Sequence, residues 1–111
     1  MNLEFDHHIA ERVLESGRGT QVTVKLGAPH PFDGHDPGQG WYCPFRVEGI
    51  NDQPWASFAG GVDSVQALML ALARIGDFLN SHADLELTFA GQQDLGFLNA
   101  GLFTARKAGE Q

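Results

Sequence analysis

Two histidines and two aspartates lie close together in one segment, at His30, Asp33, His35 and Asp36. Imidazole nitrogens and carboxylate oxygens are ligands for Zn²⁺ and related divalent ions. One interpretation is therefore a small metal-dependent or ligand-binding enzyme that uses this segment. However, the spacing matches no established zinc motif, and the segment is rich in the turn-forming residues Asp, Gly and Pro. A solvated loop without metal is the simpler interpretation.

The single cysteine, Cys43, is the candidate for a thiol nucleophile. An imidazole within hydrogen-bond reach, from His30 or His35, would lower its pKa and activate the thiolate. However, Cys43 stands between Tyr42 and Pro44 in a strand-like run, where a cysteine is more often a small buried side chain. We therefore expect a structural role for Cys43 and no catalytic residue.

Aromatic and charged side chains gather in the same region of the chain. Trp and Tyr are enriched at protein-binding hot spots, and arginine offers a planar fork of donors to an acidic partner group. We therefore expect a partner-binding surface that includes Trp41, Tyr42, Arg46 and Trp55. In the alternative interpretation, Arg46 and Glu48 form a solvated pair on their strand, and most of the aromatic side chains belong to the core.

Four strands are expected to position these residues. A strand is expected over 9–14, which contains Ile9, Val13 and Leu14, and the alternating run over 20–26 predicts a second strand, paired with the first across a turn at 16–19. The stretch 27–40 is rich in Gly and Pro, which predicts a long loop. Further strands are expected over 41–50 and 55–59, with Pro44 indicating an edge position or a bulge.

The hydrophobic period changes at Asp63, which is expected to cap a long amphipathic helix. With Asp63 at the N-cap, Gln66 occupies N3 and completes a capping box. The negative charge of Asp63 disfavours an anion site at the preceding Gly60 and Gly61. Spacings of three and four predict one buried face, made of Val65, Leu68, Met69, Leu72, Ile75 and Leu79. Gly76 marks a position where another backbone segment crosses closely.

The C-terminal part of the chain is expected to be irregular. A short strand is predicted over 85–89, and the apolar residues of 95–103 are expected to fold back onto the body. Residues 104–111 lack apolar anchors and are expected to be frayed. The fold class is therefore α+β, an antiparallel sheet of about four strands in the order β-β-β-β-α, with the helix packed on one face.

Length and charge exclude several classes of function. The 111 residues fit a single domain, 1–111. Seven basic and fourteen acidic residues give a formal net charge of −7, which disfavours binding to nucleic acid or to a membrane surface. One cysteine cannot form an intramolecular disulfide, which is typical of a reducing compartment, so we expect a cytoplasmic location. No cofactor is expected.

Three motifs carry a resemblance to a known family. They are Trp41–Gly49 (WYCPFRVEG), Ala59–Leu68 (AGGVDSVQAL) and Leu95–Phe97 (LGF). On these residues the chain resembles a family of small bacterial proteins of unknown function. The resemblance implies a sheet followed by one helix and implies no catalytic residue. Some families of such small acidic proteins resemble immunity or accessory proteins encoded beside toxins.

The sequence thus favours a non-enzymatic protein-interaction module. Its interface is expected on the sheet face that the helix leaves free and on the segment 28–40. The partner is another protein or a second copy of the chain. Two alternatives stay open, namely the small metal- or ligand-binding enzyme described above and a structural homodimer without ligand.

Overall fold

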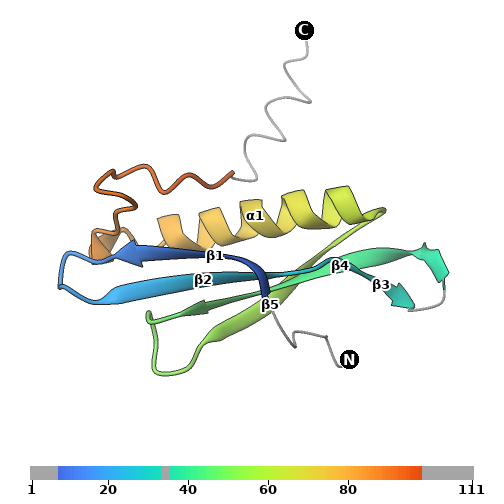
Figure 1. Ribbon diagram of the computed structural model, residues 1–111, viewed down its shortest axis with the longest axis horizontal. Helices are drawn as coiled ribbons and strands as arrows, with labels where there is room; N and C mark the ends of the chain where they lie inside the picture. The colour runs from blue at the N-terminus through green and yellow to red at the C-terminus, as the bar shows by residue number, and fades with distance from the viewer. Residues whose placement is uncertain (1–7, 34–35, 99–111) are drawn as a thin grey trace, which may run out of the picture.

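The computed structural model describes residues 8–33 and 36–98. It has two layers, with a long helix lying across one face of an antiparallel five-stranded sheet (Figure 1). The elements are β1 (His8–Glu15), β2 (Gln21–Gly27), β3 (His30–Asp33), β4 (Asp36–Glu48), β5 (Trp55–Gly61), α1 (Ser64–Asn80) and the short 3-10 helix η1 (Ala83–Leu85). The α+β class is confirmed, and the sheet has one strand more than expected.

Strand β4 is the one around which the sheet is arranged. Its residues 45–48 pair with β2 and its residues 36–42 pair with β3. Residues 41–47 pair with β5, so β2 and β3 must share the opposite edge of β4. The sheet continues outward from β2 to β1. All of these pairings are antiparallel, and one long strand therefore contacts three others.

The stretch 27–40 is not the long loop that its Gly and Pro content predicts. The chain leaves β2 at Gly27, forms β3 and returns as the first part of β4. Pro31 is compatible with this arrangement because it lies in an edge strand. There its lack of a backbone N–H breaks no hydrogen bond to a second neighbouring strand. Gly40 supplies a φ of 99° close to the register shift between β3 and β4.

Pro44 lies in neither an edge strand nor a classified bulge, because β4 is paired along both edges. It falls where the neighbour of β4 changes, since the β2 pairing begins at Phe45 and the β3 pairing ends at Tyr42. At the same point the thiol of Cys43 donates to the carbonyl oxygen of Gly27, at 3.4 Å. The junction between two pairing partners thus accommodates a residue without a backbone donor.

The start of α1 has the cap that the sequence predicts. The carboxylate of Asp63 accepts from the backbone N–H of Gln66 at 2.8 Å. The side-chain oxygen of Gln66 in turn accepts from the N–H of Val62, also at 2.8 Å. Both side chains thus satisfy backbone donors at the helix start as expected, although Gln66 reaches the N–H of the residue before the N-cap rather than that of Asp63.

The face that α1 turns to the sheet agrees only in part with the predicted one. Ile75 and Leu79 are buried, and Leu68 and Leu72 pack against the core, but Val65 and Met69 do not belong to it. Val65 is 60% exposed and Met69 is 38% exposed, whereas Ala67 and Ala71 are completely buried. The buried stripe consists of Ala67, Ala71, Ile75 and Leu79. Large side chains rise from the sheet beneath it, including Phe45 and Trp55. Alanine side chains fit against these large residues without steric overlap. The volume of the helix residues, rather than their hydrophobicity, therefore determines which face of α1 contacts the sheet.

The chain folds back over the helix side after η1 (Figure 1). A Cβ placed on Gly76 would collide with the carbonyl oxygen of Leu98, which confirms the close crossing expected there. The stretch 85–89 forms no regular strand, and Thr88 makes a single bridge to Glu15. Leu95 and Phe97 pack against the core as expected. The segment expected to be frayed, 104–111, lies outside the described residues.

Candidate functional site

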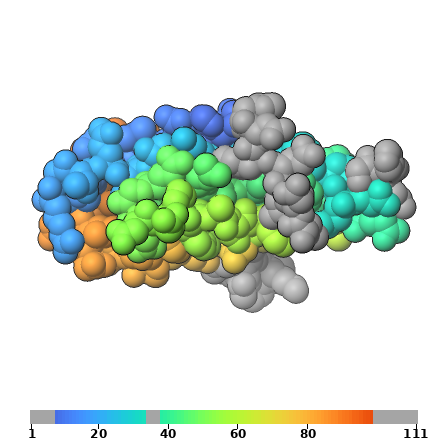
Figure 2. Space-filling view, turned by 90° about the horizontal axis from the view of Figure 1, so that it is seen from below, coloured from blue at the N-terminus to red at the C-terminus, as the bar shows by residue number. Residues whose placement is uncertain are grey.

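Strand register divides the side chains of the sheet between two faces. Leu14, Val24 and Val47 are buried on the side that α1 covers. The alternate residues of the same strands point to the other side, which we call the open face (Figure 2). The open face comprises Ile9, Val13, Thr23, Lys25, His30, Phe32, Tyr42, Arg46, Glu48 and Phe58. In the part of the chain that the structure describes, no helix lies on it.

An aromatic group lies at one end of the open face. The β3–β4 pairing places His30 opposite Tyr42, with ring centroids 5.7 Å apart. Phe32 lies 5.3 Å from Tyr42 and 5.9 Å from Phe58. Tilted and edge-to-face arrangements at these separations are favourable for aromatic pairs. The Tyr42 ring is buried within the group, while Phe32 is exposed at its margin. The group is therefore a fixed apolar feature of the surface.

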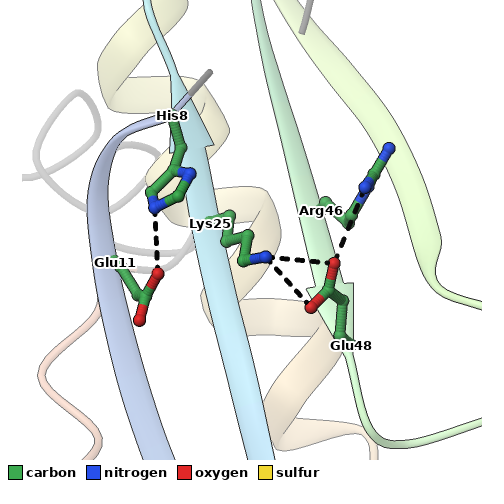
Figure 3. Close-up of polar contacts among 5 residues, drawn as sticks. All are labelled: His8, Glu11, Lys25, Arg46 and Glu48. Carbon is green, nitrogen blue, oxygen red and sulfur yellow. Dashed lines mark hydrogen bonds and ion pairs between the residues drawn. The ribbon is translucent and has the colours of Figure 1, made fainter. Parts of the chain in front are cut away.

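A charge cluster lies on the open face where β2 meets β4 (Figure 3). Lys25 Nζ lies 3.2 Å from one carboxylate oxygen of Glu48, and Arg46 Nη1 lies 3.6 Å from the other. A separate pair joins His8 to Glu11 on β1, at 2.9 Å. Exposed ion pairs of this kind contribute about 1 kcal/mol or less to stability. The main effect of the cluster is to hold two cations in fixed positions on the surface.

The four residues expected on a partner-binding surface lie on two different faces. Tyr42 and Arg46 belong to the open face. Trp41 and Trp55 lie on the helix side, where Trp55 stacks on Phe78 with ring centroids 3.9 Å apart. Successive side chains of a strand point to opposite faces, so Trp41 and Tyr42 cannot share a sheet surface. A partner on the open face would therefore be able to contact Arg46 but not the two tryptophans, and Tyr42 is only 5% exposed.

The residues expected to bind metal are only partly described. His30 packs against Tyr42, and Asp33 pairs with Asp36 at the end of the β3–β4 hairpin. His35 and the side chain of Asp36 lie outside the described residues. Within the described ranges, no three His, Cys, Asp or Glu side chains form a group that could hold a metal ion. The metal site at His30, Asp33, His35 and Asp36 stays a prediction.

Cys43 has the environment of a structural cysteine. Its side chain is completely buried on the helix side, and its thiol contacts the carbonyl oxygen of Gly27. Burial raises the pKa of the Cys43 thiol to about 11. The thiol therefore stays protonated at neutral pH, which is the opposite of what nucleophilic catalysis requires.

Arg12 is an important residue that the sequence analysis missed. Its Nη1 donates to the carbonyl oxygen of Leu95 at 2.9 Å and to that of Gly96 at 3.3 Å. Its guanidinium also lies 4.1 Å from the ring centroid of Phe89 and 5.0 Å from that of Phe97. These are favourable cation–π distances. Arg12 lies two residues before the buried Leu14 and therefore on the same side of β1. This alternation is the feature of the sequence that could have indicated a role for Arg12 on the helix side.

Clefts on the helix side of the described residues include two beside α1. One, of about 220 Å³, lies between β1, β2, α1 and the segment that contains Phe97. The other, of about 650 Å³, lies at the end of α1 and is lined by Asn80, His82, Glu86 and Thr88. His82 Nδ1 lies 2.9 Å from the carbonyl oxygen of Phe78 and must carry the proton in this contact. None of the residues expected from sequence to bind a partner or a metal ion lines either cleft.

Comparison with protein families assigns the chain to a family. A model described as a domain of unknown function, DUF6968, matches residues 10–99. The chain belongs to this family. The DUF6968 match runs from within β1 to the segment that folds back over α1, so it includes every residue of the open face except Ile9. No curated protein and no solved structure matched the chain. None of the described helices is long and apolar enough to cross a membrane.

The burial of Cys43 leads to a prediction about thiol reactivity. In the folded protein, Cys43 should react with iodoacetamide at least about a hundredfold more slowly than in urea-unfolded protein, because the thiol is inaccessible and protonated. Mass spectrometry of the alkylated chain over time measures both rates. Rapid alkylation under native conditions at neutral pH would contradict the placement of Cys43.

The contacts of Arg12 lead to a prediction about stability. Arg12→Met should lower the free energy of unfolding by about 2 kcal/mol, because it removes two charge-assisted hydrogen bonds. Arg18→Met, in the exposed turn between β1 and β2, is the matched control and should change stability by less than about 0.5 kcal/mol. Urea unfolding followed by tryptophan fluorescence measures both. Equal effects of the two variants would show that Arg12 does not fasten the segment.

Proposed function

We propose that this DUF6968 chain is a non-enzymatic protein-binding module whose interface is the open face. The observation that carries the proposal is the exposure of large apolar side chains on the side of the sheet opposite α1. Ile9 is 53% exposed, and Val13 and Phe32 are each 38% exposed. Exposed apolar side chains on a sheet face that also carries charged residues are typical of interaction sites.

The charge cluster supports the same interface. Arg46 and Lys25 are both held against Glu48, so the open face presents cations and an anion in a fixed arrangement. A partner with complementary charges would be oriented by this arrangement. All of these residues stand on paired strands, which reduces the entropy lost when a partner binds.

The environments of the candidate catalytic side chains support a non-enzymatic role. Cys43 is buried and protonated, and the His30 ring belongs to the aromatic group. We also propose a cytoplasmic location, on the basis of the single cysteine. A partner of the immunity or accessory type is consistent with the small acidic chain.

The metal-binding alternative has its own test. Calorimetric titration of tag-free protein with Zn²⁺ should show no site tighter than about 10 μM if the module is non-enzymatic. A tight site that is lost in His35→Ala would instead support an enzyme that uses His30, Asp33, His35 and Asp36.

The proposed interface can be tested with a matched pair of charge insertions. Immobilised wild-type protein should retain a stoichiometric protein partner from a lysate of the source cells. Val13→Lys should reduce the retained amount at least about tenfold, because it places a charge in the apolar part of the open face. Val62→Lys makes the same change at an exposed position before α1 and should leave retention unchanged.

Two results would contradict the proposal. One is the absence of any stoichiometric partner under native conditions. The other is equal retention by Val13→Lys and Val62→Lys, which would place the interface elsewhere. Urea unfolding of both variants confirms that each is folded before retention is compared.

A further inference from the structure

The outermost strands of the sheet differ in how their edges are protected. A free edge carries unpaired backbone groups, and proteins usually cover or interrupt it. On β1, Glu15 and Thr88 exchange two backbone hydrogen bonds, at 2.9 Å and 2.8 Å. Arg12 fastens the same returning segment beside β1. Strand β3, which pairs with the same edge of β4 as β2, is only four residues long and contains Pro31. Both of these strands are therefore poor templates for further pairing.

Strand β5 lacks comparable protection. It spans seven residues, WASFAGG, without a charge or a proline. In the described part of the chain it pairs with β4 alone. The carbonyl oxygen of Phe58 accepts from Arg74 Nη1 on α1, so it points away from β4. Backbone groups alternate along an antiparallel strand, and those of Ala56 and Gly60 must point the same way. The outer edge of β5 thus carries a regular row of donors and acceptors, and among the described residues Arg74 covers the carbonyl oxygen of Phe58.

A groove lies next to this edge, between β5 and α1. Its volume is about 390 Å³, and its apolar lining includes Phe58, Leu70 and Ala73. Its charged lining residues are Arg74 and Asp77, one cation and one anion. The chain as a whole carries a net charge of −7. The surface along β5 is therefore a place where two copies of this acidic chain can approach without strong repulsion.

We infer that β5 pairs with β5 of a second copy of the chain across a two-fold axis. Antiparallel pairing of identical strands is self-complementary, because each edge offers the same alternation of N–H and C=O groups. No like charges meet across the pair, since β5 has none. The opposite charges of Arg74 and Asp77 allow the cation of one copy to lie toward the anion of the other.

This pairing would join two sheets into one continuous sheet. The open faces of both copies would then lie on the same side, so a partner could contact both. The inference does not rest on the proposed function, because the β5 edge and the open face are different surfaces. Each can be abolished while the other is kept.

The decisive variant replaces Ala56 by proline. The N–H of Ala56 points outward, so Ala56→Pro removes a donor from the edge and leaves the β4–β5 ladder intact. Ala56→Ser keeps the donor at the same exposed position and is the matched control. Sedimentation equilibrium of the full chain between about 10 μM and about 1 mM should show a dimer for wild type and Ala56→Ser. The dimer dissociation constant should rise about tenfold or more in Ala56→Pro, because two hydrogen bonds are lost per dimer.

Sedimentation can contradict the inference in two ways. A wild-type protein that stays monomeric up to about 1 mM would overturn the inference, as would a dimer that Ala56→Pro does not weaken. If Ala56→Pro fails to fold, wild-type protein provides an independent test through amide hydrogen exchange. The N–H groups of Ala56, Phe58 and Gly60 should become more protected as the protein concentration rises. Protection that does not depend on concentration would overturn the inference.

Discussion

The close approach of α1 to the β4–β5 pair is the constraint on which the rest of the structure depends. Ala67 and Ala71 are completely buried at this contact. A Cβ on Gly61 would collide with the amide nitrogen of Ala67. The helix therefore lies against backbone and small side chains, while Phe45 and Trp55 fill the space beside it. A larger residue at any of these positions would lift the helix from the sheet.

This contact determines where polar and apolar surfaces can lie. One helix and the returning segment, fastened by Arg12, complete the core over a single face of the sheet. The described residues provide no second layer for the other face, which carries its apolar and charged side chains outward. At the proposed interface, paired strands would hold the contact residues in place when a partner binds. In the described part of the chain, β5 likewise pairs with β4 alone.

Several features could be predicted because local physics decides them. The alternation over 20–26 predicted β2, Asp63 and Gln66 predicted the helix start, and Gly76 predicted a close crossing. Others depend on distant neighbours. Composition alone could not show that the Pro- and Gly-rich stretch 27–40 pairs along β4. Spacing could not decide between the stripe of Val65 and Met69 and the stripe of Ala67 and Ala71, because both have helical periods and only the volumes beneath the helix distinguish them.

For the candidate site, too, the strands could be predicted from sequence, but the face of the sheet to which each residue belongs could not. Tyr42 and Arg46 were correctly expected on strands, but the face of each residue follows from register, which also sends Trp41 and Trp55 to the helix side. The role of Arg12 could not be predicted from sequence, because its stabilising contacts are with Phe89 and Phe97, which are distant in the chain.

Hydroxyl-radical footprinting with mass spectrometry tests the central claim most directly, because it reports the solvent access of individual side chains in the intact protein. At low protein concentration, Phe32 on the open face should be oxidised at least about tenfold faster than Phe45 beneath α1, since oxidation follows exposure. Equal protection of Phe32 and Phe45 would contradict the account, because it would mean that the open face is covered by the chain itself.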